Sequence, residues 1–163
     1  MESIRWGDVA EWFDPLGNGS APDVVVPHTA VADWEAVLEL VRSEGWRCEF
    51  EFGERRRSLP ASAAELFVPS PEGFVRSLWV WPDPGLEWIL RPSTLDEIVG
   101  DVSLHEIQGQ ERLDVFCRFL RTLGAVLGKP VLIYAEGAYD DYPPMMAYEL
   151  AEDRVVFLAG SWR

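Results

Sequence analysis

The segment that decides the fold is residues 111–137, which read ERLDVFCRFLRTLGAVLGKPVLIYAEG. Its apolar side chains recur every three or four residues, the spacing of one helix face, at Leu113, Phe116, Cys117, Leu120, Leu123, Val126 and Leu127. This pattern predicts a helix over Glu111–Leu127 that ends at Gly128 and cannot continue through Pro130. The apolar run Val131–Tyr134 that follows this stop is typical of a short buried strand.

A second helix is predicted over Val31–Ser43, and a strand over Trp46–Phe52 follows it. The helix has one apolar face, formed by Trp34, Val37, Leu38 and Val41. Thr29 or Asp33 can cap its start, and Gly45 can end it. The strand alternates cleanly, because every second residue from Trp46 is apolar and the residues between are charged.

Two hairpins are predicted from pairs of β-prone segments joined by short turns. Phe74–Trp81 and Leu86–Arg91 flank a Pro-Asp-Pro-Gly turn, and Met145–Leu150 and Arg154–Ala159 flank Ala-Glu-Asp. Tight turns favour antiparallel pairing. We therefore expect an α+β fold: one domain over residues 1–163, with a largely antiparallel sheet and two main helices packed on one face.

Three other segments give weaker patterns. Residues 1–29 are expected to form an irregular N-terminal segment, within which Val24–Val26 is a short β-prone run stopped by Pro27. Gly53–Ser62, which contains three consecutive arginines, is expected to be a polar loop. Thr94–Val99 is expected to form a short helix, because Ser93 or Thr94 can cap it and acids follow in its first turn.

The charge of the chain limits its partners. The 28 acidic and 14 basic side chains give a net charge of −14, and residues 1–45 alone carry −7. Such a surface repels phosphate backbones and anionic lipid, so nucleic acid and membrane are poor partners and a basic protein is a good one. The simpler interpretation is that the acids only keep the protein soluble.

The location expected from the sequence is cytoplasmic. The N-terminus MESIRWGDVAEWFD is acidic where a signal peptide is basic and then apolar, and the longest apolar run is far below the roughly 20 residues of a membrane span. The two cysteines, Cys48 and Cys117, lie on predicted apolar faces, which favours reduced, buried thiols.

No motif for phosphate, dinucleotide, acyl-enzyme or metalloprotease chemistry occurs in the chain. His28 and His105 are far apart and have no cysteine at zinc-ligand spacing, so neither a metal site nor a cofactor is expected. A cysteine nucleophile would need an exposed thiol beside a histidine, and the predicted burial disfavours it.

The candidate site is the loop that follows Val131–Tyr134. It holds Glu136, Tyr139, Asp140, Asp141 and Tyr142, and loops that follow strands often carry function. Tyrosine offers a large rigid contact area, and aspartate can meet Arg or Lys of a partner, so these five residues are the predicted partner-binding residues. A merely solvated loop, or a site for acid–base chemistry or a hard cation, are the alternatives.

Three tryptophans, Trp79, Trp81 and Trp88, fall on the first predicted hairpin. Trp79 and Trp81 share a face of their strand, and Trp88 could lie opposite one of them. The group would then line a ligand groove, or it would be part of the core.

The segment from Glu111 to Gly137, together with the final MMAYELAEDRVVFL hairpin, resembles the C-terminal half of small acidic bacterial immunity proteins of polymorphic toxins. The resemblance covers about 55 residues and rests on helix–Gly–strand features that also occur elsewhere. It implies tight binding to a cognate toxin without catalysis, and it assigns no site residue.

The sequence therefore predicts a non-enzymatic acidic binding protein, of the immunity type, for a basic protein partner. The alternative is a small enzyme or ligand-binding domain that uses Glu136, Asp140 and Asp141 beside a pocket lined by tryptophans. A third possibility is a homo-oligomer joined by exposed aromatic residues, and the oligomeric state is left open.

Overall fold

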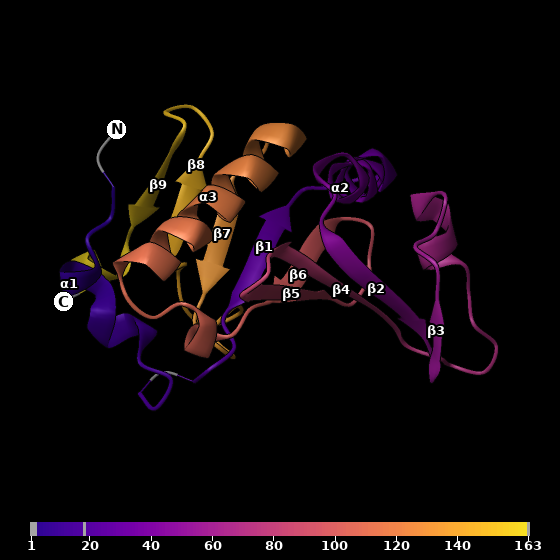
Figure 1. The fold of residues 1–163 in the computed structure, drawn as a ribbon, viewed down its shortest axis with the longest axis horizontal. Coiled ribbons are helices and arrows are strands. Elements are labelled where there is room, and N and C mark those ends of the chain that lie inside the picture. Colours follow the sequence, from indigo (N-terminus) through magenta and orange to yellow (C-terminus); the bar gives the residue numbers. More distant parts are fainter. Residues whose placement is uncertain (1–2, 18, 163) are drawn as a thin grey trace.

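The computed structural model describes residues 3–17 and 19–162, and their side chains as far as residue 160. The described strands form one antiparallel sheet in the order β3-β2-β4-β5-β6-β1-β7-β8-β9 (Figure 1). The strands are β1 (Asp23–Pro27), β2 (Arg47–Phe52), β3 (Arg55–Arg57), β4 (Arg76–Asp83), β5 (Leu86–Leu90), β6 (Glu97–Asp101), β7 (Val131–Tyr134), β8 (Met146–Glu149) and β9 (Arg154–Phe157).

Two long helices, α2 (Val31–Glu44) and α3 (Gln110–Leu127), pack on the sheet and against each other. Both end at a glycine in the left-handed conformation, Gly45 and Gly128, as the sequence predicts. The shorter helical elements are α1 (Trp6–Val9) and four 3₁₀ turns, η1 (Ala10–Phe13), η2 (Ala63–Phe67), η3 (Leu104–Glu106) and η4 (Ala159–Trp162). The predicted α+β fold with a largely antiparallel sheet and two main helices is confirmed.

The start of α2 uses one of the two predicted capping residues. The Asp33 carboxylate accepts a hydrogen bond from the Ala30 N–H at 2.8 Å. Thr29 instead donates its hydroxyl to the Leu95 carbonyl, at 2.6 Å, and so joins the end of β1 to the segment before β6.

Both predicted hairpins are confirmed, since β4 pairs with β5 and β8 pairs with β9 in antiparallel register. The prediction for Gly53–Ser62 was wrong in part, because Arg55–Arg57 form β3 on the edge of the sheet and pair with Phe50–Phe52 of β2. The three arginines include no apolar residue, so this stretch lacks the alternation of apolar and polar side chains that predicts a strand.

The expectation of an irregular segment over residues 1–29 was wrong in part, although the β-prone run Val24–Val26 predicted within it is confirmed as a strand. Its run of valines is β1, which lies between β6 and β7 near the middle of the sheet. The prediction of a helix over Thr94–Val99 was also wrong, because Glu97–Asp101 pair with β1 as β6. For β6, pairing with a distant strand decides the structure against the local helix pattern, and for β1 distant pairing decides where the predicted run lies in the sheet.

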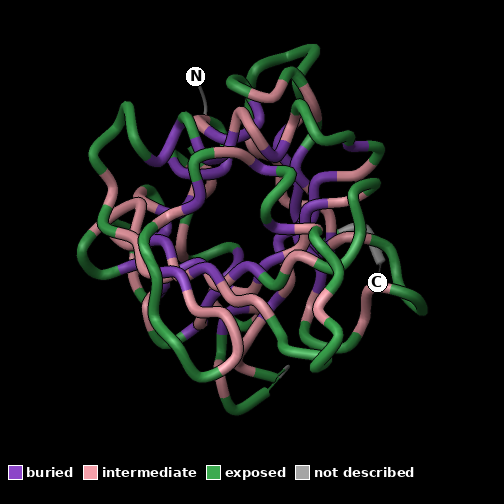
Figure 2. Tube along the Cα trace, turned by 90° about the vertical axis from the view of Figure 1, so that its right-hand side faces the viewer, coloured by how far each residue is buried: buried purple, intermediate pink, exposed green. Residues whose placement is uncertain are grey.

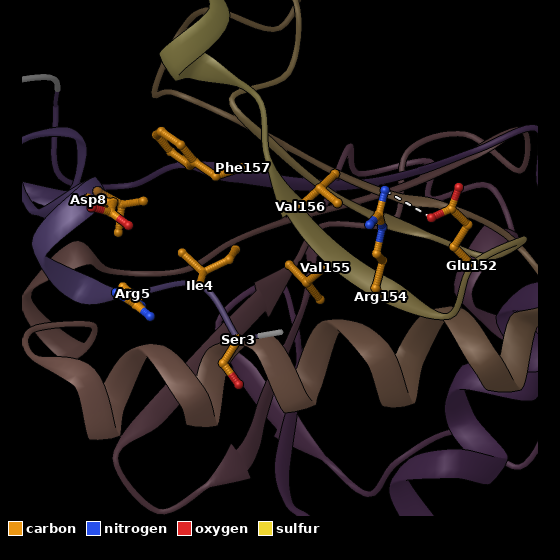
Figure 3. A pocket seen from close by; sticks show the side chains of 10 residues that line it. Ser3, Ile4, Arg5, Asp8, Glu152, Arg154, Val155, Val156 and Phe157 are labelled. Atoms are coloured by element: carbon orange, nitrogen blue, oxygen red, sulfur yellow. Dashed lines mark ion pairs between the residues drawn. The ribbon is translucent and has the colours of Figure 1, made fainter. Parts of the chain in front are cut away.

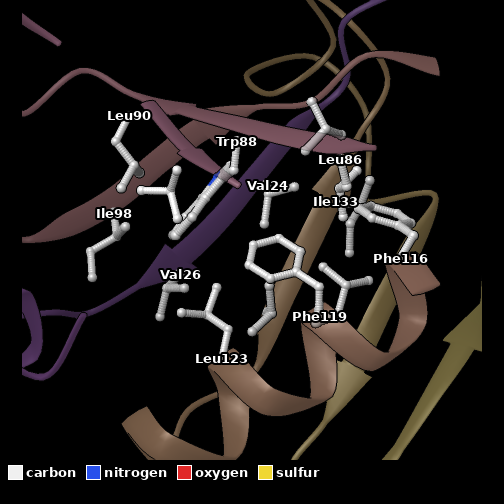
Figure 4. Packing of buried hydrophobic residues seen from close by; sticks show 14 of the residues in the cluster. Val24, Val26, Leu86, Trp88, Leu90, Ile98, Phe116, Phe119, Leu123 and Ile133 are labelled. Atoms are coloured by element: carbon white, nitrogen blue, oxygen red, sulfur yellow. The ribbon is translucent and has the colours of Figure 1, made fainter. Parts of the chain in front are cut away.

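The core lies between α2, α3 and one face of the sheet. Trp88 of β5 and Phe119 of α3 meet edge to face, with ring centroids 5.1 Å apart, and Val24, Val26 and Ile133 lie beside them (Figure 4). Buried residues gather around the interior of the molecule, and the exposed residues are mostly in the connecting loops (Figure 2).

The closest approach between α3 and the sheet is at Gly124. A Cβ atom on this residue would lie 2.2 Å from the Tyr148 ring of β8 and 3.0 Å from the Lys129 carbonyl oxygen. Only a glycine therefore lets the last turns of α3 rest on the aromatic ring. The Tyr148 hydroxyl in turn donates to Asp153 at 2.8 Å, and Asp153 also accepts from Arg121 of α3.

The second face of the sheet is turned away from α2 and α3, and we call it the open face. The alternation of each strand places Trp79, Ile89, Val99, Leu132 and Val156 there, all half-buried. Acidic side chains lie among them, including Asp23, Glu87, Glu97 and Asp101. A face of this composition is shielded from water only in part.

The two cysteines are half-buried rather than fully buried, in contrast to the prediction. Cys117 packs against the core and also lines a cavity of about 330 Å³ with Ile4 and Val155. Burial raises the pKa of the Cys117 thiol to about 12 and, less strongly, raises the pKa of Cys48.

Substitution of Gly124 tests the contact between α3 and β8. Gly124→Ala should destabilise the protein by about 2 kcal/mol in urea unfolding, because overpacking against Tyr148 outweighs the better helix propensity of alanine. Val126→Ala, at an exposed position of the same helix, should change the stability by less than about 0.5 kcal/mol. A Gly124→Ala protein as stable as wild type would contradict the close packing.

Alkylation tests the environment of Cys117. Near neutral pH its thiolate population should be about 10³-fold smaller than that of an unperturbed thiol, because the pKa rises from 9.0 to about 12. Iodoacetamide should therefore modify native Cys117 far more slowly than the urea-unfolded chain, as followed by mass spectrometry. Rapid stoichiometric labelling of the folded protein would show that the thiol is open to solvent.

Candidate functional site

The loop between β7 and β8, residues 135–145, is held closed by backbone hydrogen bonds. At its base the Met145 N–H donates to the Ile133 carbonyl at 2.8 Å. Within it, the Ala138 N–H donates to Ala135, and the N–H groups of Asp141 and Tyr142 both donate to Ala138. The loop is thus a compact pair of turns with few free backbone groups.

Tyr139 anchors the loop to the open face. Its hydroxyl donates to the Glu97 carboxylate of β6 at 2.6 Å, and its ring meets that of Tyr134 of β7 edge to face, with centroids 4.8 Å apart. Since β6 and β7 flank β1, the side chain of Tyr139 lies across β1, where Val25 is fully buried. The hydrogen bond to Glu97, together with burial, raises the pKa of Tyr139 to about 12.

Glu136 anchors the other side of the loop. Its carboxylate accepts a hydrogen bond from the Ser20 N–H at 2.9 Å. Gly19 has a positive φ of 79°, and a Cβ atom there would lie within 3 Å of the Glu136 side chain. The segment before β1 and the loop after β7 therefore pack together at Gly19 and Glu136, and any side chain at position 19 would push them apart.

Asp140, Asp141 and Tyr142 are presented to solvent. All three are exposed, Tyr142 by 63%, and none takes part in an ion pair or side-chain hydrogen bond within residues 3–17 and 19–160. The five predicted partner-binding residues thus separate into two anchors, Glu136 and Tyr139, and three outward-facing side chains. The structure brings them together in one loop, as their sequence proximity requires.

Further carboxylates lie beside this loop on the open face. Asp23 and Asp101 are directly paired across β1 and β6, and Arg91 forms an ion pair with Asp101 at 2.7 Å. Burial, with repulsion from Asp101 and Glu136, raises the pKa of Asp23. Burial likewise raises the pKa of Glu87, with repulsion from Glu106 and Asp101.

Sequence reasoning missed this acidic neighbourhood because its members are far apart along the chain. Asp23, Glu87 and Asp101 become neighbours only through the register of β1, β5 and β6. The alternation in β5 places Glu87 opposite the core residues, but it does not say which strand pairs with it. The pairing of β1 with β6 involves residues 1–29 and Thr94–Val99, which were not predicted to pair. The sequence therefore did not indicate that these carboxylates are neighbours.

The three tryptophans of the first hairpin do not form one pocket. Trp79 and Trp81 share the open face, as predicted, whereas Trp88 lies opposite Val80 and is fully buried in the core. Trp81 lines a cavity of about 310 Å³ with Trp46 and Pro82, and the Arg47 guanidinium lies 4.2 Å from the Trp81 ring centroid. Among the described residues, Glu136, Asp140 and Asp141 line neither this cavity nor those beside β9, Cys117, Phe119 and Phe74.

In the part of the chain that the structure describes, no group of three or more His, Cys, Asp or Glu side chains is arranged to hold a metal ion. No helix in the same part of the chain has the length and apolar character needed to cross a bilayer.

Comparison with known proteins yields no relative: no family model, no curated protein and no solved structure matches this chain. The resemblance to immunity proteins thus rests on the quoted segment alone. What the chain does must be inferred from the geometry of the loop and of the open face.

Substitution of Tyr139 tests the anchor. Tyr139→Phe keeps the ring contact with Tyr134 but loses the bond to Glu97, and should cost about 1 kcal/mol at neutral pH. Because the folded pKa is raised, this stability is present below pH 10 and is lost as the pH rises from 10 to about 12. Wild type should therefore lose its advantage over Tyr139→Phe across this range, as measured by urea unfolding.

Tyr142→Phe serves as the control, because Tyr142 is exposed and its hydroxyl has no side-chain partner among the described residues. It should leave the stability unchanged within about 0.5 kcal/mol at every pH tested. An equal effect of both substitutions would contradict the anchoring role of Tyr139.

Proposed function

We propose that this protein is a non-enzymatic, cytoplasmic binding protein of the immunity type, which covers a basic surface of a protein partner. The observation that carries the proposal is the anchored loop: Glu136 and Tyr139 hold it, while Asp140, Asp141 and Tyr142 face outward. The resemblance of residues 111–137 to immunity proteins supports the same function.

The anchors matter energetically because binding normally costs the entropy of ordering a loop. Here hydrogen bonds to Glu97 and Ser20 and the ring contact with Tyr134 order the loop before any partner arrives. A preordered loop loses less conformational freedom on binding, so more of the contact energy remains as affinity. Tyr142, more than half exposed, is the side chain best suited to bury itself in a pocket of the partner.

The charge around the loop supports a basic partner. Asp140 and Asp141 add to Asp23 and Asp101 on the adjoining open face, within a chain of net charge −14. Such a surface accelerates association with a positively charged protein, most strongly at low ionic strength. Burial, and after it repulsion between neighbouring carboxylates, raises the pKa of Asp23 and of Glu87, and a docked Lys or Arg would relieve that repulsion.

Binding kinetics test the proposal, with the protein encoded next to this chain as the first partner to examine. The double variant Asp140→Asn/Asp141→Asn should slow association about three- to tenfold at low salt and flatten its salt dependence. Tyr142→Ala should instead speed dissociation, by a factor equivalent to about 1–3 kcal/mol if Tyr142 is a binding hot spot.

The matched control is Glu54→Gln/Glu72→Gln, which removes two exposed acids near β3 and Gly73, away from the loop. It should change the association rate much less than the aspartate pair does. Thermal melts should be unchanged for all three variants, because none of the substituted side chains is buried. If both rates remain at wild-type values in every variant, the loop is not the interface and the proposal fails.

A further inference from the structure

The two edges of the sheet differ in a way that concerns pairing with other chains. β3, at one edge, consists of three arginines, and charge on a short edge strand opposes pairing with other strands. β9, at the other edge, carries Val155, Val156 and Phe157 after Arg154. A β-branched and aromatic edge of this kind favours pairing with a further strand.

The outward backbone groups of β9 can be assigned from its pairing with β8. The Leu158 N–H donates to the Met145 carbonyl of the chain before β8, at 2.8 Å. In an antiparallel pair every second residue directs its backbone groups at the partner strand, so the backbone groups of Val156 and Arg154 also point toward β8. The N–H and C=O groups of Val155 and Phe157 therefore point away from β8. Among the described strands, none lies beside these two donors and two acceptors.

A groove runs along the side of β9 that faces away from β8. It has a volume of about 910 Å³ and lies between β9 and the N-terminal segment Ser3–Val9. Val155, Val156 and Phe157 project from the strand, while Ser3, Ile4 and Arg5 face them from the other side (Figure 3). The groove therefore leaves room for a strand beside β9 at the ordinary spacing of about 4.8 Å.

The charges along the groove balance, unlike those of the whole chain. Arg5 and Arg154 face Asp8 and Glu152, and Arg154 is 2.9 Å from Glu152. A groove without net charge offers a basic partner no attraction, and it adds no repulsion of its own at the contact between two copies of the chain. This balance favours a second copy as the occupant.

We propose that β9 pairs antiparallel with β9 of a second copy, so that two nine-stranded sheets join into one. In one register the outward backbone groups of Val155 and Phe157 all form hydrogen bonds. In that register Val156 lies on the twofold axis, and Val155 lies opposite Phe157 of the second copy. Four backbone hydrogen bonds then form, two for each Val155–Phe157 pair. Val155 and Phe157 of both copies lie on the helix side and Val156 on the open face, so the interface is self-complementary.

The pairing is independent of the proposed function, because β9 and the loop of residues 135–145 use different residues. A dimer of this kind would present two copies of the loop. Failure of either proposal leaves the other untouched: partner kinetics test the loop, whereas the tests below use the protein alone.

Cross-linking tests the register directly. In a Cys48→Ser/Cys117→Ala background, Val156→Cys places two thiols at a pair whose Cα atoms should lie about 4.5 Å apart, within the range for a disulfide. Mild oxidation should yield a covalent dimer on a non-reducing gel. Val155→Cys is the matched control, because it lies opposite Phe157 of the second copy and should form no covalent dimer on the same gel. The reverse result, or no cross-link at either position, would overturn the register.

Analytical ultracentrifugation tests the dimer itself. Val155→Pro removes one outward donor per copy while the bonds to β8 remain, and should weaken association about 30-fold. Val156→Lys should also weaken it through like charges on the axis, whereas Val156→Thr should preserve it. Melting curves show whether each variant remains folded. A wild-type protein that stays monomeric at high micromolar concentration overturns the proposal and leaves the groove for a strand of another protein.

Discussion

The rest of the structure depends on the contact of α3 with the sheet. Phe119 meets Trp88 on β5, and Gly124 lets the helix rest on Tyr148 of β8, so a single helix spans strands that belong to both predicted hairpins. Because α2 packs beside α3 on the same side, most of the fully buried large apolar side chains lie on one face of the sheet. The opposite face is left with alternating apolar and acidic residues, and the candidate loop folds onto it.

The elements that sequence reasoning could predict are those whose pattern is local. The faces of α2 and α3 repeat within a few residues, and both hairpins have their turns between the paired strands. β3 and β6 were missed because their strand character comes from distant pairing, whereas Val24–Val26 was predicted as a β-prone run but not as a strand near the middle of the sheet. Ile98, for instance, becomes a core residue only because Val26 lies beside it in the sheet.

In the candidate site, too, the features that could be predicted are those that are local in the sequence. The five loop residues were predicted together because they are close in sequence. The anchoring roles of Glu136 and Tyr139 were not predicted, because their partners, Ser20 and Glu97, are far away in the sequence. Residue type alone could not distinguish Glu136, which anchors the loop, from Asp140 and Asp141, which are exposed to solvent. The difference arises from the three-dimensional position of β1 and of the segment that precedes it.

The position of β1 has a consequence for the order in which the protein can form during synthesis. β1 leaves the ribosome before its neighbours β6 and β7, which are made about 75 and 110 residues later. Until then its valines have no sheet to join, and the nascent chain must carry them exposed. Pairings of such long sequence separation slow folding, and the middle of this sheet can close only after β7 has been made. A product truncated before β7 would lack one neighbour of its central strand and could not close the middle of the sheet.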